Sequence, residues 1–542
     1  MKLPSMTYSN GMAPATQTAF TGLNHTPGAG DGELYHMENL TGVFYPLLAS
    51  RPPRWKVATL TQPGGLFARD GLCWVAQGGF WYQGERKGDV SPGEKSFASL
   101  GAYILIFPDK AYYNTQTGTF GSLESTWTGT GASFQNGTIY EQEAQANTIQ
   151  AAGVNWADYF HKGDAITISG CATHPENNKS LIIRDIQEDK LVFYEYSFAL
   201  DGEKGDEGYT EPGEVTISRT VPDLDFVCEN ENRVWGCKDN TIYCSKLGDP
   251  FNFNVFDGLA TDAYAVDTGS AGRFTGCISY LGYPIFFKED HIYKVYGTIP
   301  SNFQVMGTET LGVAEGCGKS LAVAGEVLFY VSRVGVMAYS GGVPQCVSRN
   351  LGQPKLGRAA AGADGLRYYL SAQEEGEGWS LYAYDTQTKL WHREDATQAT
   401  HFAKNGGNLY LLNHLGEIWT VGWGTTPPEE AQQEEMVEWQ AEFADFTDGS
   451  PDKKGLFRLH IRLEVEEGGQ VQAWAQVDSD GEWLPMGQPI GPTPKRSFQL
   501  PMVPRRGDHY RIKLTGTGQC RIYSITRERY GGSAYNATPG RT

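Results

Sequence analysis

The sequence lacks the long apolar runs that characterise membrane proteins. Its longest apolar runs, such as residues 103–107 and 327–331, fall far short of the roughly 20 residues needed to span a bilayer. The N-terminal residues, Met-Lys-Leu-Pro-Ser-Met-Thr-Tyr, include no apolar segment ahead of a small-residue cleavage site, so Sec-dependent secretion is not expected. We therefore expect a protein that has no membrane-spanning segment and is made in the cytoplasm.

Basic residues are also scarce. Asp and Glu outnumber Lys and Arg by 63 to 44, which gives a formal net charge of −19. Because DNA affinity comes largely from Lys and Arg that neutralise phosphates, this balance argues against a protein that wraps nucleic acid. Two interpretations stay open: an acidic surface could line a channel through which DNA slides without being gripped, or it could simply keep a large assembly subunit in solution.

Disulfide and helical patterns are missing as well. The nine cysteines are odd in number, scattered and without a Cys-x-x-Cys pair, so we expect buried free thiols. Helical periodicity is rare, whereas 67 glycines, 12% aromatic residues and frequent turn signals are typical of many short strands. The expected fold class is all-β, and a chain of 542 residues exceeds what one core supports.

Two segments of the chain repeat one hairpin pattern. Residues 232–245 place β-forming residues on both sides of a Lys-Asp-Asn turn, and Gly-Asp-Pro and an aromatic run at 251–256 follow. Residues 283–296 repeat this order around a Lys-Glu-Asp turn and return through 303–306. About seven such units recur at a spacing near 40 residues, the period of propeller blades. The sequence thus predicts a β-propeller of about six to seven blades.

Composition shifts divide the chain further. Strand-like runs between 123 and 222 interrupt the repeat and suffice for a small barrel inserted at a loop tip. After a Pro-Pro-Glu-Glu linker, apolar and polar residues alternate with period two, which predicts a sandwich. The predicted parts are an N-terminal arm (1–55), the first part of the propeller (56–122), an inserted small β-barrel domain (123–222), the remainder of the propeller (223–425), and a C-terminal β-sandwich and tail (426–542).

The predicted arm contains one segment that could dock. A Phe-Tyr-Pro-Leu-Leu run at 44–48 precedes Arg-Pro-Pro-Arg at 51–54. Such a proline-punctuated apolar anchor with two arginines could bind a neighbouring subunit or the body of its own chain. The residues proposed for subunit docking are Tyr45, Leu47, Arg51 and Arg54.

Motifs for catalysis are absent from the sequence. We find no His-Glu-x-x-His, no Gly-x-Ser-x-Gly and no Walker loop, and the histidines lack ligand spacing. Asp239, Asp290 and Asp385 are acidic turn residues that could converge as hydrolytic carboxylates, but hairpin tips favour Asp for backbone reasons. Aromatic residues such as Trp81 and Phe251 could stack on sugars, although packing is the simpler role. We predict no catalytic residue, no cofactor and no metal site.

Two segments resemble a known family. Asn-Arg-Val-Trp-Gly-Cys at 232–237, continued to 254, and Tyr-Leu-Gly-Tyr-Pro-Ile-Phe-Phe at 280–287, continued to 297, resemble β-propeller structural proteins of tailed bacteriophages and prophages. The Tyr-Pro-Leu-Leu and Arg-Pro-Pro-Arg motifs of the arm are similar to that group too. In general organisation, roughly residues 40–425 resemble the tail-nozzle, tail-hub and packaged-DNA-stabilisation proteins.

This resemblance implies a structural virion protein without enzymatic turnover. It implies a homo-oligomeric ring, commonly of six copies, in the virion tail, whose channel holds the end of the genome. The implied partners are other phage tail or portal-adaptor proteins, with transient contact to phage DNA in the channel. A different hypothesis, from another class, is a carbohydrate-binding or carbohydrate-cleaving propeller that acts at the host cell surface.

Overall fold

The computed structural model describes residues 11–136, 147–187, 189–194, 197–205, 207–352, 354–449, 453–502 and 505–531. Within these residues there is no α-helix, only strands and short 3-10 turns such as η2 (Trp156–Asp158), η3 (Pro175–Asn177), η4 (Pro300–Asn302) and η5 (Arg349–Leu351). None of the helices described is long and apolar enough to cross a bilayer. The chain divides into two compact units, Gln62–Gly312 and the pair of segments Met1–Thr61 and Val313–Thr542.

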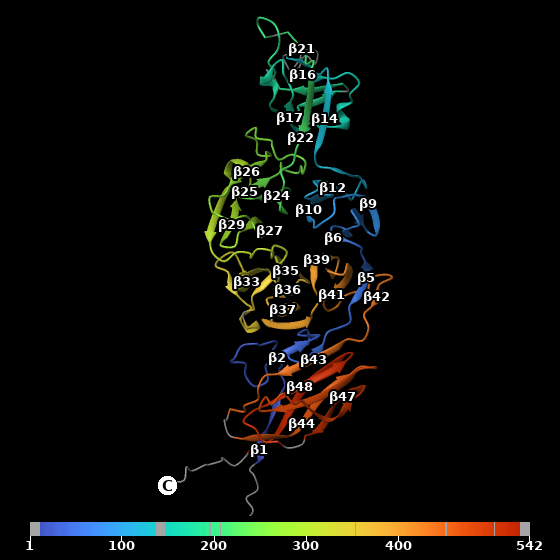
Figure 1. Cartoon of the computed structure of the whole chain (residues 1–542), viewed down its shortest axis with the longest axis vertical. Helices are drawn as coiled ribbons and strands as arrows, with labels where there is room; N and C mark the ends of the chain where they lie inside the picture. Colours follow the sequence, from blue (N-terminus) through green and yellow to red (C-terminus); the bar gives the residue numbers. More distant parts are fainter. Residues whose placement is uncertain are drawn as a thin grey trace, which may run out of the picture. The chain divides into compact units, whose positions relative to one another are not determined.

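Four antiparallel sheets in the unit Gln62–Gly312 are propeller blades. In each, the four strands pair in chain order (Figure 1). The first strands of consecutive blades, β10, β23 and β27, lie beside one another. The blades are β6 (Pro63–Ala68), β7 (Leu72–Ala76), β8 (Gly79–Tyr82) and β9 (Glu85–Asp89); β10 (Ser96–Leu100), β11 (Tyr103–Phe107), β12 (Ala111–Asn114) and β13 (Phe120–Ser122); β23 (Phe226–Asn230), β24 (Arg233–Lys238), β25 (Thr241–Cys244) and β26 (Tyr264–Asp267); and β27 (Gly276–Tyr280), β28 (Tyr283–Phe287), β29 (His291–Tyr296) and β30 (Gln304–Glu309).

Three further blades belong to the other unit. Their first strands, β31, β35 and β39, again lie side by side. The blades are β31 (Ala322–Ala324), β32 (Val327–Ser332), β33 (Gly335–Tyr339) and β34 (Gln345–Cys346); β35 (Leu356–Ala363), β36 (Arg367–Glu374), β37 (Gly378–Asp385) and β38 (Leu390–Asp395); and β39 (Ala399–Asn405), β40 (Asn408–Asn413), β41 (Glu417–Val421) and β5 (Trp55–Thr59), with β42 (Gln432–Gln433) added at the edge. The predicted propeller fold class is confirmed: the described residues form seven blade sheets, four in one unit and three in the other.

The last blade joins both ends of the propeller segment. Strand β5, which precedes all other blade strands in the chain, pairs with β41, so that Glu417 faces Thr59 and Ile418 faces Ala58. The edge of β41 is therefore covered rather than left open, which is how closed β architectures avoid exposed strand edges.

The repeated segment that predicted the propeller folds as two consecutive blades. Strands β24 and β25 pair around a turn at Asp239, whose φ of 50° places it in the left-handed region that Asp and Asn tolerate. Trp235 and Ile242 are buried in the core of this blade pair, and Phe286 of the next blade joins them. Local turn chemistry and alternating apolar residues thus suffice to form each blade.

The inserted domain, predicted at 123–222, is confirmed as a small β domain around one core. Trp127, Phe134, Trp156 and Ile217 are buried in that core. It interrupts the chain between β13 and β23, and Ser125 and Arg219 at its root are register partners. Its two sheets are β14 (Ser125–Thr130), β22 (Glu214–Arg219), β17 (Ala165–Ser169) and β18 (Ser180–Ile182), and β19 (Asp185–Gln187), β20 (Lys190–Phe193), β16 (Asn147–Gln150), β15 (Ser133–Gln135) and β21 (Tyr209–Thr210).

The Gly-Asp-Pro turn and aromatic run at 248–256 hold this domain in place. The side chain of Asn252 accepts a hydrogen bond from the amide of Ala165 (2.9 Å) and donates one to Asp164 (3.0 Å). The Arg219 guanidinium pairs with Asp164 and lies 5.1 Å from the ring centroid of Phe251. Residues 248–256, which follow a blade strand, therefore also bind the inserted domain within the same unit.

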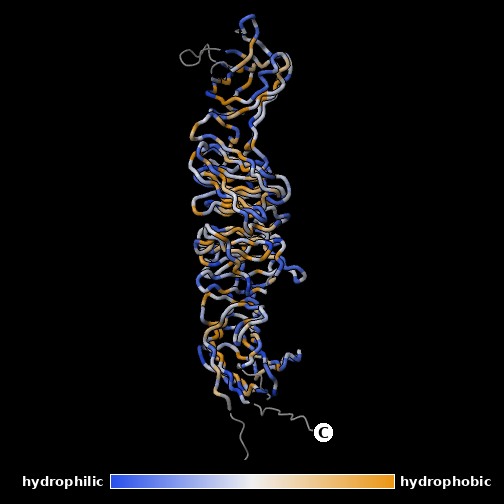
Figure 2. Tube along the Cα trace, turned by 90° about the vertical axis from the view of Figure 1, so that its left-hand side faces the viewer, coloured by the Kyte–Doolittle hydropathy of each residue, from blue (hydrophilic) through white to orange (hydrophobic). Residues whose placement is uncertain are grey.

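The C-terminal sandwich is confirmed, and the N-terminal part of the chain completes it. Buried and outward-facing residues alternate along its strands, as at Glu438–Phe443 and Gln470–Val477, and Figure 2 shows hydrophobic and hydrophilic residues interspersed along the trace. One sheet is β3 (Leu40–Thr41), β4 (Leu48–Ser50), β49 (Cys520–Gly531), β44 (Lys454–Val465) and β47 (Thr493–Pro501), with β1 (Gly11–Gln17) on β49; the other is β2 (Leu34–Glu38), β43 (Glu438–Phe443), β48 (Tyr510–Thr517), β45 (Gln470–Val477) and β46 (Leu484–Ile490).

The prediction of an N-terminal arm at 1–55 was wrong. Within residues 11–54, β1 and β4 pair with β49, and β2 pairs with β43. The physical reason is that β43 and β49 would otherwise expose an unpaired edge, which a strand from elsewhere in the chain can cover. The first ten residues of the predicted arm and the predicted tail from 532 onward lie outside the described residues.

Candidate functional site: a groove on the C-terminal sandwich

A groove of about 900 Å³ lies on the outer face of the five-stranded sheet. All of its lining residues belong to the unit of Met1–Thr61 and Val313–Thr542. They come from β2, β43, β45, β46 and β48, from the end of β38, from the linker before β43, and from Asn39 and Arg51 in the N-terminal segment. The lining residues are Glu38, Asn39, Arg51, Asp395, Glu434, Glu435, Met436, Val437, Glu438, Trp439, Gln440, Gln470, Gln472, Trp474, Pro489, Thr515, Gly516 and Thr517.

Polar side chains from three neighbouring strands form the floor. Gln440 of β43 and Gln472 of β45 are both register partners of Thr515 on the central strand β48. Successive side chains of β45 point to opposite faces of the sheet. Val471 and Ala473 therefore face the core, and Gln472 and Trp474 face outward. Register partners have Cβ atoms roughly 5 Å apart, so these amide and hydroxyl groups form a row across the sheet.

Trp474 lies on the same outer face as this row, whereas Trp439, a register partner of Gly516, lies on the core face with Val471. The indole Nε1 of Trp474 donates a hydrogen bond to the Thr515 hydroxyl (3.0 Å), which fixes its ring beside the floor. Trp439 is 3% exposed, and its buried Nε1 has no hydrogen-bond partner among the described residues. The Trp439 ring lies against Gly516, where an added Cβ would come within 2.4 Å of Cζ2. Glycine at this position is what lets the ring lie so close to the strand.

An ionic cluster forms one wall of the groove. Arg51 donates two hydrogen bonds to the carboxylate of Glu434 (2.7 and 2.9 Å). Arg54 binds Glu394 (2.6 Å) and Asp395 (2.7 Å). We call these five residues the arginine cluster. It joins the N-terminal segment, the last strand of a blade and the linker into one structure.

Burial and charge oppose each other at the carboxylates of this cluster. Burial alone would raise the pKa of Asp395, but the guanidinium groups of Arg54 and Arg51 and the hydrogen bonds from Thr397 lower it to about 2. Burial likewise acts to raise the pKa of Glu434, and the hydrogen bond and charge of Arg51 lower it below its ordinary value. Both carboxylates are therefore ionised at neutral pH.

The four residues proposed for subunit docking do not form one surface. Arg51 and Arg54 are 3% and 7% exposed and bind their own chain through the arginine cluster, so docking onto a neighbouring subunit is the wrong role for them. Two long guanidinium side chains next to three carboxylates are more stable when paired within the fold than when presented to solvent. Tyr45 is 45% exposed and Leu47 is half-buried. Only these two retain the exposure that docking needs.

The three turn aspartates occupy separate hairpin turns. Asp239 and Asp290 are exposed at hairpin turns of separate blades. Asp385 is 5% exposed, accepts hydrogen bonds from the amides of Gln387 and Thr388 (both 3.0 Å) and pairs with Arg367. Each carboxylate thus has a local structural role.

The aromatic residues named for sugar stacking have packing partners in the blades. Trp81 is half-buried and its indole N–H donates to the backbone oxygen of Ala76 (3.4 Å). Phe251 is half-buried, with its ring centroid 5.4 Å from that of Tyr103. The nine cysteines are free thiols, six buried and three half-buried, as the sequence predicted. The groove residues Gln440, Gln472 and Trp474 were not predicted. Their only signal in the sequence is the Gln-Val-Gln-Ala-Trp-Ala-Gln alternation at 470–476, which resembles any solvent-facing strand.

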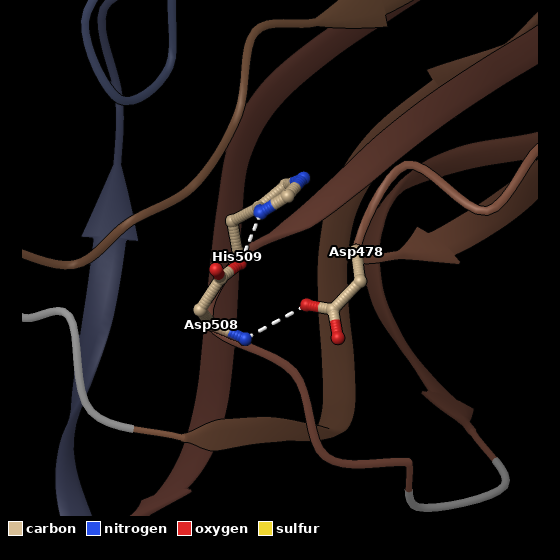
Figure 3. A group of neighbouring side chains, drawn as sticks. All are labelled: Asp478, Asp508 and His509. Carbon is tan, nitrogen blue, oxygen red and sulfur yellow. Dashed lines mark hydrogen bonds and ion pairs between the residues drawn. The ribbon is translucent and has the colours of Figure 1, made fainter.

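Asp478, Asp508 and His509 are near one another on two loops of the sandwich, with one potential ligand atom from each within 4.8 Å (Figure 3). The amide of Asp508 donates to the Asp478 carboxylate (2.8 Å), and His509 bonds Asp508 through Nδ1 and Ser479 through Nε2. The hydrogen bond from His509 lowers the pKa of Asp508. These contacts hold the turn at 478–481 against the start of β48.

Comparison with known proteins gives no family for this chain. It matches no protein-family model and no curated protein. Among solved structures, it is similar to BamB from Moraxella catarrhalis, at 10% identity over 68% of this chain and 98% of that chain, with a TM-score of 0.34. It is also similar to an exo-β-1,3-galactanase from Phanerochaete chrysosporium, at 8% identity over 54% and 92%, with a TM-score of 0.21. These low TM-scores support no inference about function.

Proposed function

We propose that the protein is a structural component of a bacteriophage virion. In this proposal it is a propeller of the tail-nozzle or tail-hub type, which assembles into a ring around the DNA exit channel and retains the packaged genome. It is made in the host cytoplasm and resides in the virion tail, where it contacts other tail or portal-adaptor proteins.

One observation carries this proposal. The two segments that resemble phage propeller proteins, 232–254 and 280–297, fall in two consecutive blades of the unit Gln62–Gly312. The resemblance therefore lies in complete structural units that repeat through the chain.

The strand pairing in the unit of Met1–Thr61 and Val313–Thr542 also suits a structural role. Residues 11–54 and 437–531 share both sheets of the sandwich, and β5 is part of the last blade. Both ends of the described chain are thus fastened by strand pairing. The net charge of −19 suits a channel that repels the phosphate backbone and lets DNA slide.

A carbohydrate-cleaving propeller is the less favoured function. Hydrolysis of a glycosidic bond normally requires two carboxyl groups that flank it, about 5 to 10 Å apart. Asp239 and Asp290 stand at separate turns, and Asp385 is engaged by Arg367. Carbohydrate binding without cleavage remains compatible with the groove and is developed in the next subsection.

The oligomeric state of the purified full-length chain tests the proposal. Mass photometry and negative-stain electron microscopy should show a closed ring of several copies, and antibodies against the protein should label the tails of particles from the source phage. A gel-shift assay at about 150 mM salt should show no retention of duplex DNA, because the chain lacks the excess of cations that such binding needs. A monomer at all concentrations together with unlabelled particles would contradict the proposal.

A further inference from the structure

We infer that the groove on the C-terminal sandwich is a binding site for a neutral oligosaccharide. This inference goes beyond the structural role proposed above and does not depend on ring formation. It rests on the size of the groove, the chemistry of its floor, the indole ring of Trp474 and the sign of its charge.

The size of the groove suits a small flexible ligand. Its volume of about 900 Å³ falls within the roughly 300–1,000 Å³ of ligand sites in proteins. Its floor is a β-sheet, a rigid element that holds side chains in fixed positions.

The floor offers both donors and acceptors in a row. Each glutamine amide presents two N–H donors and one carbonyl acceptor, and threonine presents a hydroxyl that does both. The Gln472 amide nitrogen donates to the backbone oxygen of Ala473 (2.8 Å), which orients this side chain on the surface. Sugar hydroxyls also donate and accept, so a row built from Gln440, Thr515 and Gln472 matches a chain of hydroxyl groups better than it matches an apolar ligand.

Trp474 supplies the apolar component. The C–H face of a sugar ring is apolar, and a large flat indole covers such a surface. Trp474 is half-buried on the outer face, and its N–H donates to the Thr515 hydroxyl, which fixes the ring beside the polar row. A sugar ring that packs on this indole would therefore place its hydroxyls against Gln472 and Thr515.

The charge of the groove disfavours anionic ligands. Arg51 is the only Lys or Arg among the residues that line the groove, and Glu434 occupies its guanidinium group. Five carboxylates accompany it, from Glu38, Asp395, Glu434, Glu435 and Glu438. A phosphate, a sialic acid or a nucleic acid would meet five carboxylates, while the one cation of the lining is already paired. Lys513 lies 5.8 Å from the ring of Trp474 but does not line the groove. The charge thus disfavours an anion, and the amides and hydroxyl of the floor suit a neutral ligand.

Titration of the full-length protein with neutral and acidic glycans tests the inference. The probes are maltohexaose, cellohexaose and chitohexaose, with hyaluronan hexasaccharide as the acidic counterpart and tetralysine as a cationic peptide. We expect at least one neutral probe to bind, detected by tryptophan fluorescence and by ligand-observed NMR. Trp474→Ala should weaken that binding roughly tenfold or more, a loss of about 1.4 kcal/mol, and Gln472→Leu should weaken it without changing the size of the side chain.

The chain offers a matched control. Tyr523 lies on β49 of the other sheet with the ammonium of Lys495 3.7 Å from its ring, much as Lys513 lies 5.8 Å from the ring of Trp474. Tyr523→Ala should leave the affinity unchanged, and circular dichroism should show that all variants are folded. The inference is overturned if no neutral probe binds at about 10 mM, a concentration that detects even weak complexes, if Trp474→Ala binds as the native chain does, or if the acidic or cationic probe binds more tightly.

Discussion

The blades and the C-terminal sandwich differ in how far apart in the sequence their paired strands lie. The blade β27–β30 is complete within residues 276–309. In the sandwich, by contrast, Thr16 hydrogen-bonds Thr526, which is 510 residues away. Contacts between distant segments cost more loop-closure entropy and form later than local ones. The blades can therefore form from contiguous sequence, whereas the sandwich needs both ends of the chain.

Removal of residues 1–54 should have the largest effect, because it takes strands from both sheets of the sandwich and leaves the blades of Gln62–Gly312 intact. Six large buried apolar side chains of the described residues are lost: Phe20, Leu23, Leu34, Met37, Leu40 and Leu48. At about 2 kcal/mol each they account for about 12 kcal/mol, which is comparable with the stability of a whole domain. Limited proteolysis with mass spectrometry should find residues 437–531 cleaved and 62–312 protected. Equal protection of both segments would contradict the proposed interdependence.

Loss of one arginine from the arginine cluster should have the next largest effect. Arg54→Ala leaves Glu394 and Asp395 ionised, buried and without their main partner. Breaking a buried ion pair on one side typically costs about 3–5 kcal/mol. Urea denaturation should show this loss in the unit that contains the sandwich. Arg462→Ala, which removes an exposed arginine from β44, is the control and should change stability by less than about 0.5 kcal/mol.

The same contrast explains what the sequence could predict. Blades were predictable because each hairpin has its signals within a few residues, as in the Asp239 turn between β24 and β25. The inserted domain and the sandwich were predictable from changes in that pattern. The count of about seven units also agrees with the seven blades.

Features that depend on distant partners were not predictable. Residues 11–54 are rich in Gly and Pro and have little periodicity, so nothing local shows that β2 pairs with β43. Arg51 and Arg54 look like surface residues until Glu394, Asp395 and Glu434 are known to face them. The groove was not predictable because Gln472 and Trp474 lie on the outward side of β45, whose alternation is that of any half-exposed strand.

Lowering the pH should reduce the stability that the arginine cluster contributes, but by less than Arg54→Ala does. The pKa of Asp395 is lowered to about 2, so its contribution is complete above its unfolded value near 4 and is lost as pH falls toward 2. That difference corresponds to about 2 kcal/mol. Buried His392, whose pKa is lowered to about 4, adds a separate loss between about pH 6.5 and 4.

Urea midpoints measured from pH 7 to 2.5 separate these two steps. The step below pH 4 should shrink in Arg54→Met, because Asp395 then loses its main cationic partner and titrates closer to its ordinary pKa. The step between pH 6.5 and 4 should persist in that variant. An unchanged profile below pH 4 would show that the cluster does not set the acid stability of this unit.

Excision of the inserted domain should have the smallest effect, although it removes a longer segment than the N-terminal deletion does. Ser125 and Arg219 are register partners, so their Cα atoms lie about 5 Å apart and a Gly-Gly linker can join Glu124 to Thr220. Leu123 and Val221 on either side stay buried in the neighbouring blade core.

Excision breaks few contacts with the blades. Asp164 and Arg219 are both removed, so neither charge is left without its partner. Asn252 keeps its hydrogen bond to Asp249 (2.7 Å). We expect the melting temperature of the unit Gln62–Gly312 to change by only a few degrees, which corresponds to a loss of about 1 kcal/mol. Differential scanning calorimetry of the full-length and excised chains measures this change. If the excised chain fails to fold, the blades on either side of the insertion are not the self-sufficient units that their local strand pairing indicates.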